Sequence, residues 1–327
     1  MDWYINLCIM KNKPIAIIFS DLHLNIWSKF NQDNERTLNQ IRVLFHIRSL
    51  CKKYKCPALF CGDMLHKPEN IDQDLMELIH DKLSDKFLGH NFYCISGNHD
   101  IKHVSNIGIK PFSWITLLTH YGFTQIDYDN IILNDNIRVY GVPYIDHNIG
   151  LSDYLNKVKL DKHYKNILLL HTDYPGAKDT DGREVGSVEN LNLNTLNKFD
   201  LVLCGHIHKP QRLSKKVYMI GAPLQQRRTD RDCKMGYWEL YPDLSMKFVH
   251  LKGYPKFIDV ESEDEILDDG NYYTILPPKS SNSIEVKHKI TKRLSKSLLA
   301  KRYMKAKGIK DIDKQKLLIN VLKESES

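Results

Sequence analysis

Short apolar segments rich in β-branched residues alternate along most of the chain with longer segments of helical periodicity. The apolar segments predict strands at Ile15–Phe19, Ala58–Cys61, Phe92–Ile95, Val139–Val142, Ile167–Leu170, Leu201–Cys204 and Val217–Ile220. Apolar residues recur at helical spacing over residues 34–54 and 75–87. Strands that alternate with helices in this way predict an α/β protein whose helices cover the faces of a sheet.

The pattern changes after Tyr254. Residues 261–270 are acidic and polar, and the segment PPKSSNS that follows is typical of a linker. Beyond it, apolar residues recur every four positions, which predicts a helix with these residues on one face: Val286, Ile290, Leu294 and Leu298. Gly308 is a plausible stop, and Asp311 can cap a second helix. We therefore expect a main domain at 1–254, a small cap or linker at 255–283 and a helical hairpin at 284–327.

The net charge of +7 is concentrated in that hairpin. Residues 284–327 carry 13 Lys and Arg against 5 Asp and Glu, so the rest of the chain is close to neutral. A basic segment favours an acidic partner, and a solvated helix pair without a partner fits the charge equally well.

Several classes of protein are disfavoured. No apolar segment approaches the 18 residues of a membrane helix, and the N-terminus lacks the basic and apolar regions of a signal peptide. The seven cysteines show no CxxC spacing and favour free thiols in a reducing compartment, which predicts a cytoplasmic protein. The compact form of 327 residues favours a bacterium or a phage-infected cell as its source. The chain has neither a P-loop motif for ATP nor the GxSxG of serine hydrolases.

Polar residues follow five of the predicted strands. The segments are SDLH, GDMLH, GNHD, a lone histidine and GHIH, and they supply Asp21, His23, Asp63, His66, Asn98, His99, Asp100, His171, His206 and His208. Because the carboxyl ends of parallel strands line one crevice, residues distant in sequence can converge there. Each segment alone has a simpler explanation, such as a turn or a structural histidine. The five together favour a metal site.

The chemistry of the set supports that interpretation. Carboxylate, imidazole and amide oxygen suit Mn²⁺, Fe²⁺ or Zn²⁺. Glycines precede three of the candidates and let the backbone turn sharply. Seven ligands exceed the needs of one tetrahedral ion and suit two ions that share a carboxylate. Two ions roughly 3.5–4 Å apart can activate a bridging hydroxide against a phosphate ester.

The order D-x-H, GD, GNHD, H and GHxH, over about residues 14–225, resembles the calcineurin-like metallophosphoesterase superfamily. The resemblance implies a four-layer α/β/β/α sandwich and two divalent ions, Mn²⁺ first, with Mg²⁺, Fe²⁺ and Zn²⁺ as alternatives. It implies one ion on Asp21, His23 and His208, a second on Asn98, His171 and His206, and Asp63 as the bridge. It further implies that His99 faces the scissile phosphate and serves the leaving oxygen, and that Asp100 orients His99.

Two segments narrow the resemblance. GDMLH and the later GAPLQQRRTDRDCKMGYWEL are similar to segments of SbcD-type DNA repair nucleases, although Ala222 replaces a common serine and Asp230 or Asp232 a common glutamate. This implies a 3′→5′ exonuclease, with endonuclease activity as a further expectation, in which His66 contacts DNA. The implied partners are DNA, a second copy of the chain and an SbcC-type coiled-coil ATPase bound through 284–323.

Two other functions stay open. The chain could be a phosphoprotein phosphatase or small phosphodiesterase of the same superfamily, which the basic tail disfavours. It could also be mainly a DNA-end-binding subunit that anchors an ATPase, which the complete ligand set disfavours. Direct binding of the tail to DNA phosphates is the rival to ATPase docking.

Overall fold

The computed structural model describes residues 13–67, 71–87, 91–102, 107–146, 149–185 and 191–276. The hairpin predicted at 284–327 and the predicted linker at 277–283 lie outside these residues. The chain divides into two compact units, of which the first contains residues up to 26 together with 36–254. The second contains residues 27–35 together with the chain from 255 onward.

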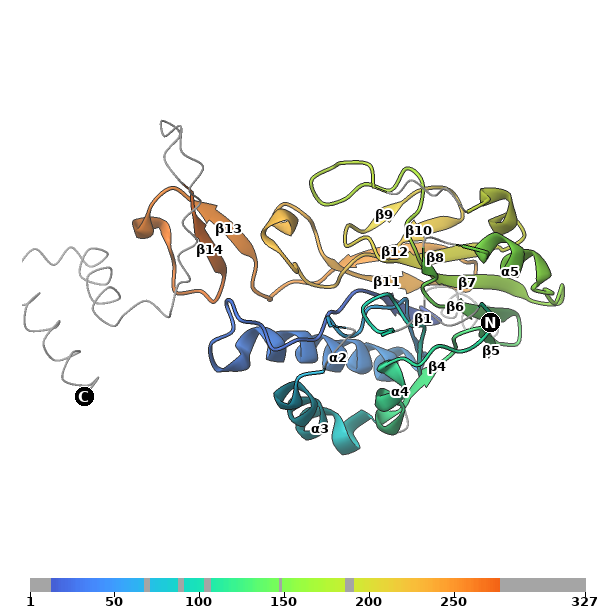
Figure 1. Ribbon diagram of the computed structural model, residues 1–327, viewed down its shortest axis with the longest axis horizontal. Helices are drawn as coiled ribbons and strands as arrows, with labels where there is room; N and C mark the ends of the chain where they lie inside the picture. The colour runs from blue at the N-terminus through green and yellow to red at the C-terminus, as the bar shows by residue number, and fades with distance from the viewer. Residues whose placement is uncertain are drawn as a thin grey trace, which may run out of the picture. The chain divides into compact units, whose positions relative to one another are not determined.

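The first unit contains two six-stranded sheets (Figure 1). One sheet has the order β12-β11-β1-β2-β3-β4, in which β1 to β4 are parallel and β11 and β12 are antiparallel additions. Its strands are β1 (Ala16–Phe19), β2 (Ala58–Phe60), β3 (Phe92–Cys94), β4 (Phe123–Gln125), β11 (Gly236–Leu240) and β12 (Met246–His250).

The second sheet has the order β5-β6-β7-β8-β10-β9. Its four central strands are parallel, and an antiparallel strand closes each edge. The strands are β5 (Asp129–Asn134), β6 (Ile137–Val142), β7 (Lys165–His171), β8 (Leu201–Gly205), β9 (Gln211–Arg212) and β10 (Val217–Met219).

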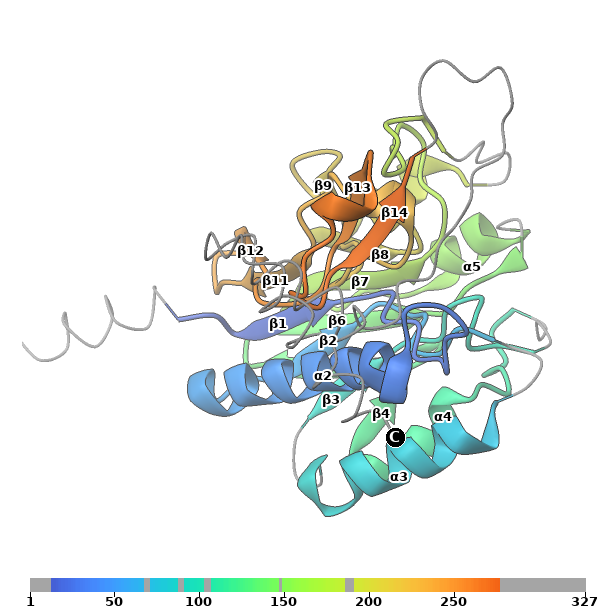
Figure 2. The same ribbon diagram turned by 90° about the vertical axis from the view of Figure 1, so that its left-hand side faces the viewer.

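Helices cover the outer face of each sheet. Figure 2 shows α2 (Glu35–Tyr54) and α3 (Gln73–Phe87) on one side of the first sheet and the second sheet on the other. Helix α5 (Leu151–Lys157) packs on the second sheet through Leu151 and Leu155. The remaining helices are α4 (Ile115–Leu118) and the 3-10 helices η1 (Gln32–Asn34), η2 (Thr119–Tyr121), η4 (Leu193–Leu196), η5 (Arg228–Asp230) and η6 (Glu263–Glu265).

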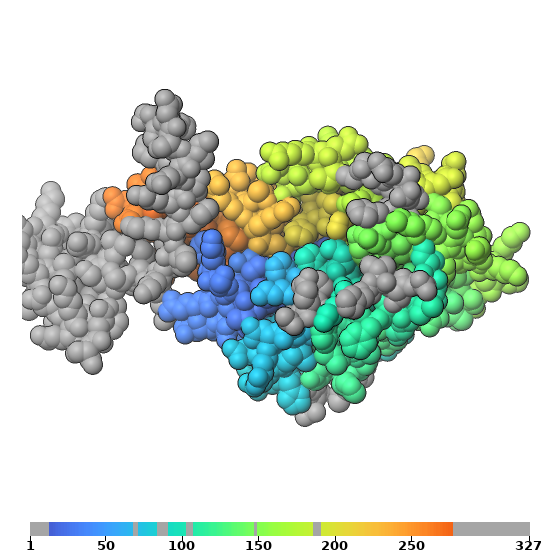
Figure 3. Space-filling view, in the orientation of Figure 1, coloured from blue at the N-terminus to red at the C-terminus, as the bar shows by residue number. Residues whose placement is uncertain are grey.

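The central strands are buried on both faces. In β7, Ile167 and Leu169 point into the core between the sheets, whereas Leu168 and Leu170 point to the core under α5. Two-sided burial explains why the strands read as continuous apolar segments rather than alternating ones. The predicted α/β sandwich of two sheets flanked by helices is confirmed. On one face of the first unit, Figure 3 shows the N-terminal segments, in blue to teal, beside the segments of the second sheet, in green to yellow.

The second unit contains a two-stranded parallel sheet. It is formed by β13 (Phe257–Val260) and β14 (Tyr272–Ile275) around a small core of Val260, Ile266 and Tyr273. Phe30 contributes its ring to this unit and packs edge-on against Phe257, with ring centroids 5.7 Å apart. Both strands lie within residues 255–283, the segment that the sequence predicts to be a cap or linker. None of the helices in the described part of the chain has the length and apolar character needed to span a membrane.

Candidate metal centre

The loops that follow β1 and β2 continue the pairing of their strands. The Asp21 N–H donates to the Gly62 carbonyl at 2.9 Å, and the His23 N–H donates to the Asp63 carbonyl at 3.0 Å. In the second sheet, the pairing of β7 and β8 places His171 opposite Gly205. The candidate residues therefore lie at adjacent strand ends, as the sequence predicts.

Four of the seven candidate ligands have left-handed backbone conformations. Their φ angles are 53° at Asp21, 51° at His23, 60° at Asp63 and 94° at His206. An L-residue in this region is uncommon and costs on the order of 1–3 kcal/mol. Such strain persists only where the surrounding structure imposes it, and it is typical of functional sites.

Glycines make room for the ligands. A Cβ on Gly62 would overlap the His171 ring, and a Cβ on Gly97 would overlap the Asp63 carboxylate. A Cβ on Gly205 would overlap the Cys61 carbonyl and the His171 ring. The glycine before each of these motifs is therefore required by close packing around the candidate ligands.

One group of ligand atoms comes from Asp21, His23 and His208, which all lie within 4.8 Å of one another. The Nε2 atoms of His23 and His208 are 3.1 Å apart. Asp21 and His23 are buried, and the Asp21 carboxylate also accepts the His206 N–H at 3.1 Å. The three side chains that the sequence assigns to one ion are therefore adjacent.

A second group surrounds Asn98. Its Oδ1 is 3.0 Å from His171 Nε2 and 3.0 Å from His206 Nδ1. Asp63, His171 and His206 also form a compact set of ligand atoms. Asp63 Oδ2 lies 3.3 Å from His171 Nε2 and 3.6 Å from His23 Nε2, so it stands between the two groups, where a bridging carboxylate would be.

The donor geometry fits divalent cations. The His171 Nδ1–H donates to the Cys61 carbonyl at 2.7 Å, so its Nε2 lies between the oxygens of Asp63 and Asn98. Two oxygens that face one ring nitrogen can be bridged by a proton on Nε2 or by a metal ion. Metal–nitrogen bonds of about 2.1 Å place neighbouring ligand atoms roughly 3.0–3.4 Å apart. The separations of 3.0–3.6 Å within the two groups lie close to that range.

The electrostatics of the site point the same way. Burial acts to raise the pKa of Asp63, but His171 and His23 outweigh it and hold that pKa well below its usual range. Burial acts to lower the pKa of His171, and Asp63 outweighs it, so the pKa rises to about 9. Burial lowers the pKa of His23 well below its usual value. Asp63 is thus an anion surrounded by imidazoles, which is the charge pattern of a cation site.

His66 and His99 lie beside the first group. Their rings stack with centroids 5.4 Å apart and planes inclined by 7°. His99 Nδ1 donates to the His66 carbonyl at 2.6 Å, and His66 Nδ1 is 3.4 Å from His23 Nδ1. Burial, followed by His99 and Arg36, lowers the pKa of His66 to about 4. His66 therefore contacts both the candidate ligand His23 and His99.

Asp100 has a different position from the one that the resemblance implies. Its carboxylate, which is fully buried, accepts hydrogen bonds from Asp63 N at 2.8 Å, Leu65 N at 3.0 Å and Gly97 N at 2.9 Å. The His99 ring is instead held by the His66 carbonyl. Burial, and then Asp63, raise the pKa of Asp100 to about 7. Asp100 joins the GDMLH loop to the GNHD loop.

Three further residues near the centre are absent from the sequence-based set. Asp173 Oδ1 is 3.2 Å from His206 Nε2, and Asp230 Oδ2 is 3.8 Å from His208 Nδ1. The Tyr144 ring lies 6.3 Å from the His171 ring and 6.1 Å from the His206 ring. The only sequence signal for Asp173 is its place two residues beyond the histidine that ends β7.

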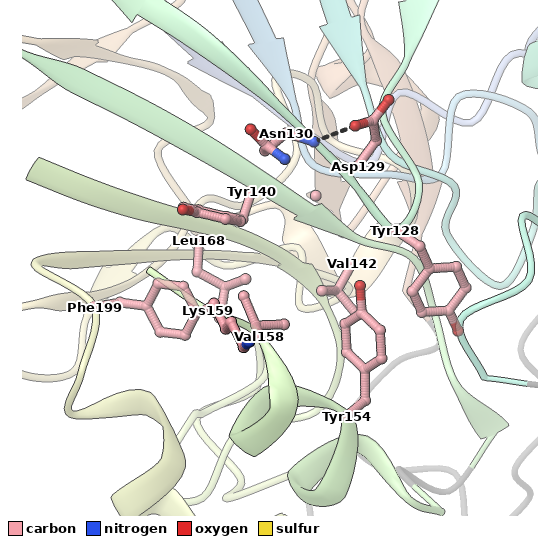
Figure 4. Close-up of a pocket in the computed structure, with 11 residues that line it drawn as sticks. Tyr128, Asp129, Asn130, Tyr140, Val142, Tyr154, Val158, Lys159, Leu168 and Phe199 are labelled. Atoms are coloured by element: carbon pink, nitrogen blue, oxygen red, sulfur yellow. Dashed lines mark hydrogen bonds between the residues drawn. The ribbon is translucent and has the colours of Figure 1, made fainter. Parts of the chain in front are cut away.

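A separate cavity of about 220 Å³ lies on the outer side of the second sheet (Figure 4). Side chains from β5, β6, β7 and α5 line it, including Tyr140, Val142, Tyr154 and Leu168. None of its lining residues belongs to the groups described above. The cavity is therefore distinct from the candidate metal centre.

The fold and these groups define an α/β sandwich protein with a candidate divalent metal centre at the carboxyl ends of its strands. The family model described as calcineurin-like phosphoesterase matches residues 16–210, more than half of the chain, and the protein belongs to that family of metal-dependent phosphoester hydrolases. The match runs from β1 through GHIH and so includes all seven candidate ligands.

A crystal structure matched by fold is 11% identical, with a TM-score of 0.44. The match covers 73% of this chain and 100% of that chain. This likeness is too low to bear on function.

Proposed function

We propose that the protein is a two-metal DNA nuclease, a 3′→5′ exonuclease that also cleaves internally, acting in double-strand-break processing. The observation that carries the proposal is the convergence of seven donors with Asp63 between the two groups. Asp21, His23 and His208 would hold one ion, and Asn98, His171 and His206 the other. Bound divalent ions would polarise the phosphoryl oxygens and lower the pKa of a water molecule.

His99 is the proposed catalytic histidine. The backbone N–H of His99 donates to Asp63 Oδ1 at 2.8 Å, which fixes the His99 backbone to the proposed bridging carboxylate. Its Nδ1–H donates to the His66 carbonyl at 2.6 Å, so Nε2 is the ring nitrogen that, after it takes up a proton from solvent, would pass that proton to the leaving oxygen. His66 supports this arrangement through both its carbonyl and its stacked ring.

Positive charge near the centre supports a polyanionic substrate. Arg36 and Lys67 both act to lower the pKa of His66. Burial acts to lower the pKa of His208, but Asp230 and Asp21 outweigh burial and raise that pKa. The positive charge of Arg227 acts in the direction of burial and lowers it. Arg36 is buried and donates to the Gln226 carbonyl at 2.6 Å, but Lys67 and Arg227 are exposed, and their charge favours an anionic phosphate ester. The similarity of GDMLH and residues 221–240 to SbcD-type nucleases supports the same substrate.

The proposal extends to the rest of the chain. Residues 255–283 would act as a small cap, and the basic segment 284–323 would bind an SbcC-type ATPase or DNA. We further propose that the protein is cytoplasmic, that it works with Mn²⁺ and that it forms a homodimer.

A substrate panel tests the proposal. The full chain is incubated with Mn²⁺, Mg²⁺ or chelator and offered linear duplex DNA, circular single-stranded DNA and a phosphomonoester. Mn²⁺-dependent loss of the linear duplex is expected. Rapid turnover of the phosphomonoester with intact DNA would favour a phosphatase, and DNA binding without cleavage would favour an end-binding subunit.

Point variants test the mechanism. Asp63→Ala and His206→Ala should abolish DNA cleavage, whereas Asp181→Asn, an exposed carboxylate in the loop after β7, should cut like the wild type. Cleavage by Asp63→Ala in Mn²⁺ would refute the two-metal mechanism. His66→Ala should reduce end-dependent degradation more than Mn²⁺ content. Because His66 lies 3.4 Å from His23 Nδ1, an equal loss of both would assign His66 to ligand support.

A further inference from the structure

Asp173 and His206 come from neighbouring strand ends. β7 ends at His171, two residues before Asp173, and β8 ends at Gly205, directly before His206. The pairing of His171 with Gly205 brings the following residues together. Asp173 Oδ1 reaches His206 Nε2 at 3.2 Å, while the other ring nitrogen, Nδ1, is 3.0 Å from Asn98 Oδ1.

This arrangement determines which nitrogen of His206 can bind a cation. A neutral imidazole carries one proton, on either Nδ1 or Nε2. A carboxylate at Nε2 accepts a hydrogen bond and keeps the proton there. Nδ1 then presents its lone pair toward Asn98 and the group that contains Asp63 and His171. Carboxylates that orient metal-binding histidines in this way typically change metal affinity by about 10–100-fold.

We propose that Asp173 is a positioning residue that fixes the tautomer and ring orientation of His206 as a ligand for the ion shared with Asn98 and His171. The inference rests on the proposed function only in taking His206 to be a metal ligand. It requires no assumption about the phosphoester that is hydrolysed.

The effect should be confined to one ion. At the other histidine of GHIH, Asp230 Oδ2 is 3.8 Å from His208 Nδ1, which is longer than a hydrogen bond. Asp230 Oδ2 instead accepts the backbone N–H groups of Gln226 at 2.8 Å and Arg227 at 3.1 Å. Asp173 and His206 are more accessible, with side chains 43% and 25% exposed. Replacing Asp173 therefore strands no buried charge, and the variant should fold.

Mn²⁺ titration of the metal-free full chain tests the proposal, with affinities from equilibrium dialysis and coupling between the ions from electron paramagnetic resonance. The wild type should bind two ions. Asp173→Ala should bind one ion normally and the other about 10–100-fold more weakly. Asp173→Asn should lose less affinity, because the amide oxygen can still accept the Nε2–H bond. Asp181→Asn is the matched control in the same loop and should bind like the wild type.

DNA cleavage by the same samples separates this inference from the proposed function. Asp173→Ala should recover hydrolysis in excess Mn²⁺, since its defect is affinity. The inference would be overturned if Asp173→Ala bound both Mn²⁺ ions with wild-type affinity. It would also be overturned if Asp181→Asn lost as much Mn²⁺ affinity as Asp173→Ala. A wild type that binds two Mn²⁺ ions but leaves DNA intact would refute the nuclease function, and the loss of one ion in Asp173→Ala would still support the role of Asp173.

Discussion

Removal of the Asp100 carboxylate should destabilise the metal-free protein strongly. The side chain is fully buried and accepts three backbone N–H groups, from Asp63, Leu65 and Gly97, at 2.8–3.0 Å. Asp100→Ala leaves these donors without a partner, and each unsatisfied buried donor costs about 1–3 kcal/mol. Relief of a buried charge offsets part of this cost. We expect a net loss of about 3–5 kcal/mol in the free energy of unfolding.

Asp100→Asn should be far milder. An amide oxygen in the place of Oδ2 keeps the bonds from Asp63 N and Gly97 N, while the amide nitrogen opposes the Leu65 N–H. The substitution also removes a charge whose burial beside Asp63 is unfavourable. The expected loss is about 1–2 kcal/mol.

Urea unfolding in chelator, followed by circular dichroism, measures both variants against the wild type and the exposed control Asp181→Asn. The change in free energy is taken from the shift of the midpoint at constant slope. If Asp100 instead serves His99, as the family resemblance implies, Asp100→Ala should lose hydrolysis and keep its stability. A midpoint shift worth less than about 1 kcal/mol in Asp100→Ala would refute the structural role.

Three further predictions follow from the same contacts. Burial and Asp63 raise the pKa of Asp100 to about 7 in the folded protein, above the unfolded value of about 3.9, so the folded state of the wild type loses stability as pH rises between these values. In chelator, Asp100→Asn should therefore gain stability relative to the wild type from about pH 4 to about pH 7. A difference in stability that stays constant with pH would contradict this. Gly97→Ala places a Cβ against the Asp63 carboxylate and should weaken Mn²⁺ binding at least about 10-fold in equilibrium dialysis, with unchanged affinity as the contrary result. Leu169→Ala opens a cavity in the core between the sheets and should lower the free energy of unfolding in urea by about 2–5 kcal/mol. The number of bound Mn²⁺ ions should not change, and a loss of metal binding would show that this core also shapes the centre.

Most central strands were predictable because both of their faces are buried, although β11 (GYWEL), which is also internal and buried, was missed. The edge strands were not. β5 (DNIILN) leaves Ile132 54% exposed, and β4 (FTQ) exposes its middle residue, so neither forms a buried apolar segment. Helix α3 begins at Gln73, two residues before the predicted start, because the Asp72 carboxylate caps the Asp74 N–H at 2.9 Å. Capping by a polar side chain is invisible to apolar periodicity.

The candidate ligands were predictable for a related reason. Parallel strands bring their carboxyl ends to one edge, so the order of motifs along the chain is enough to place Asp21, Asp63 and His206 near one another. The residues around them were not predictable. Asp100 acts on backbone N–H groups, and Asp173 meets His206 only through the register of β7 and β8. Contacts to the main chain, or across strands of unknown register, leave no pattern in the sequence.

Hydrogen bonds within the fold hold the loops that carry the candidate ligands. Gln40 Nε2 donates to the carbonyls of Leu22 and His23 at 2.7 Å and 2.8 Å, which holds the first ligand loop from helix α2. Asp100 holds the second and third loops together. These bonds, made inside the fold, support the left-handed conformations of Asp21, His23 and Asp63. Because these bonds fix the backbone of the ligand loops, the donors would need little rearrangement to bind an ion, and on our proposal Asp173 adds the choice of the ring nitrogen that His206 presents.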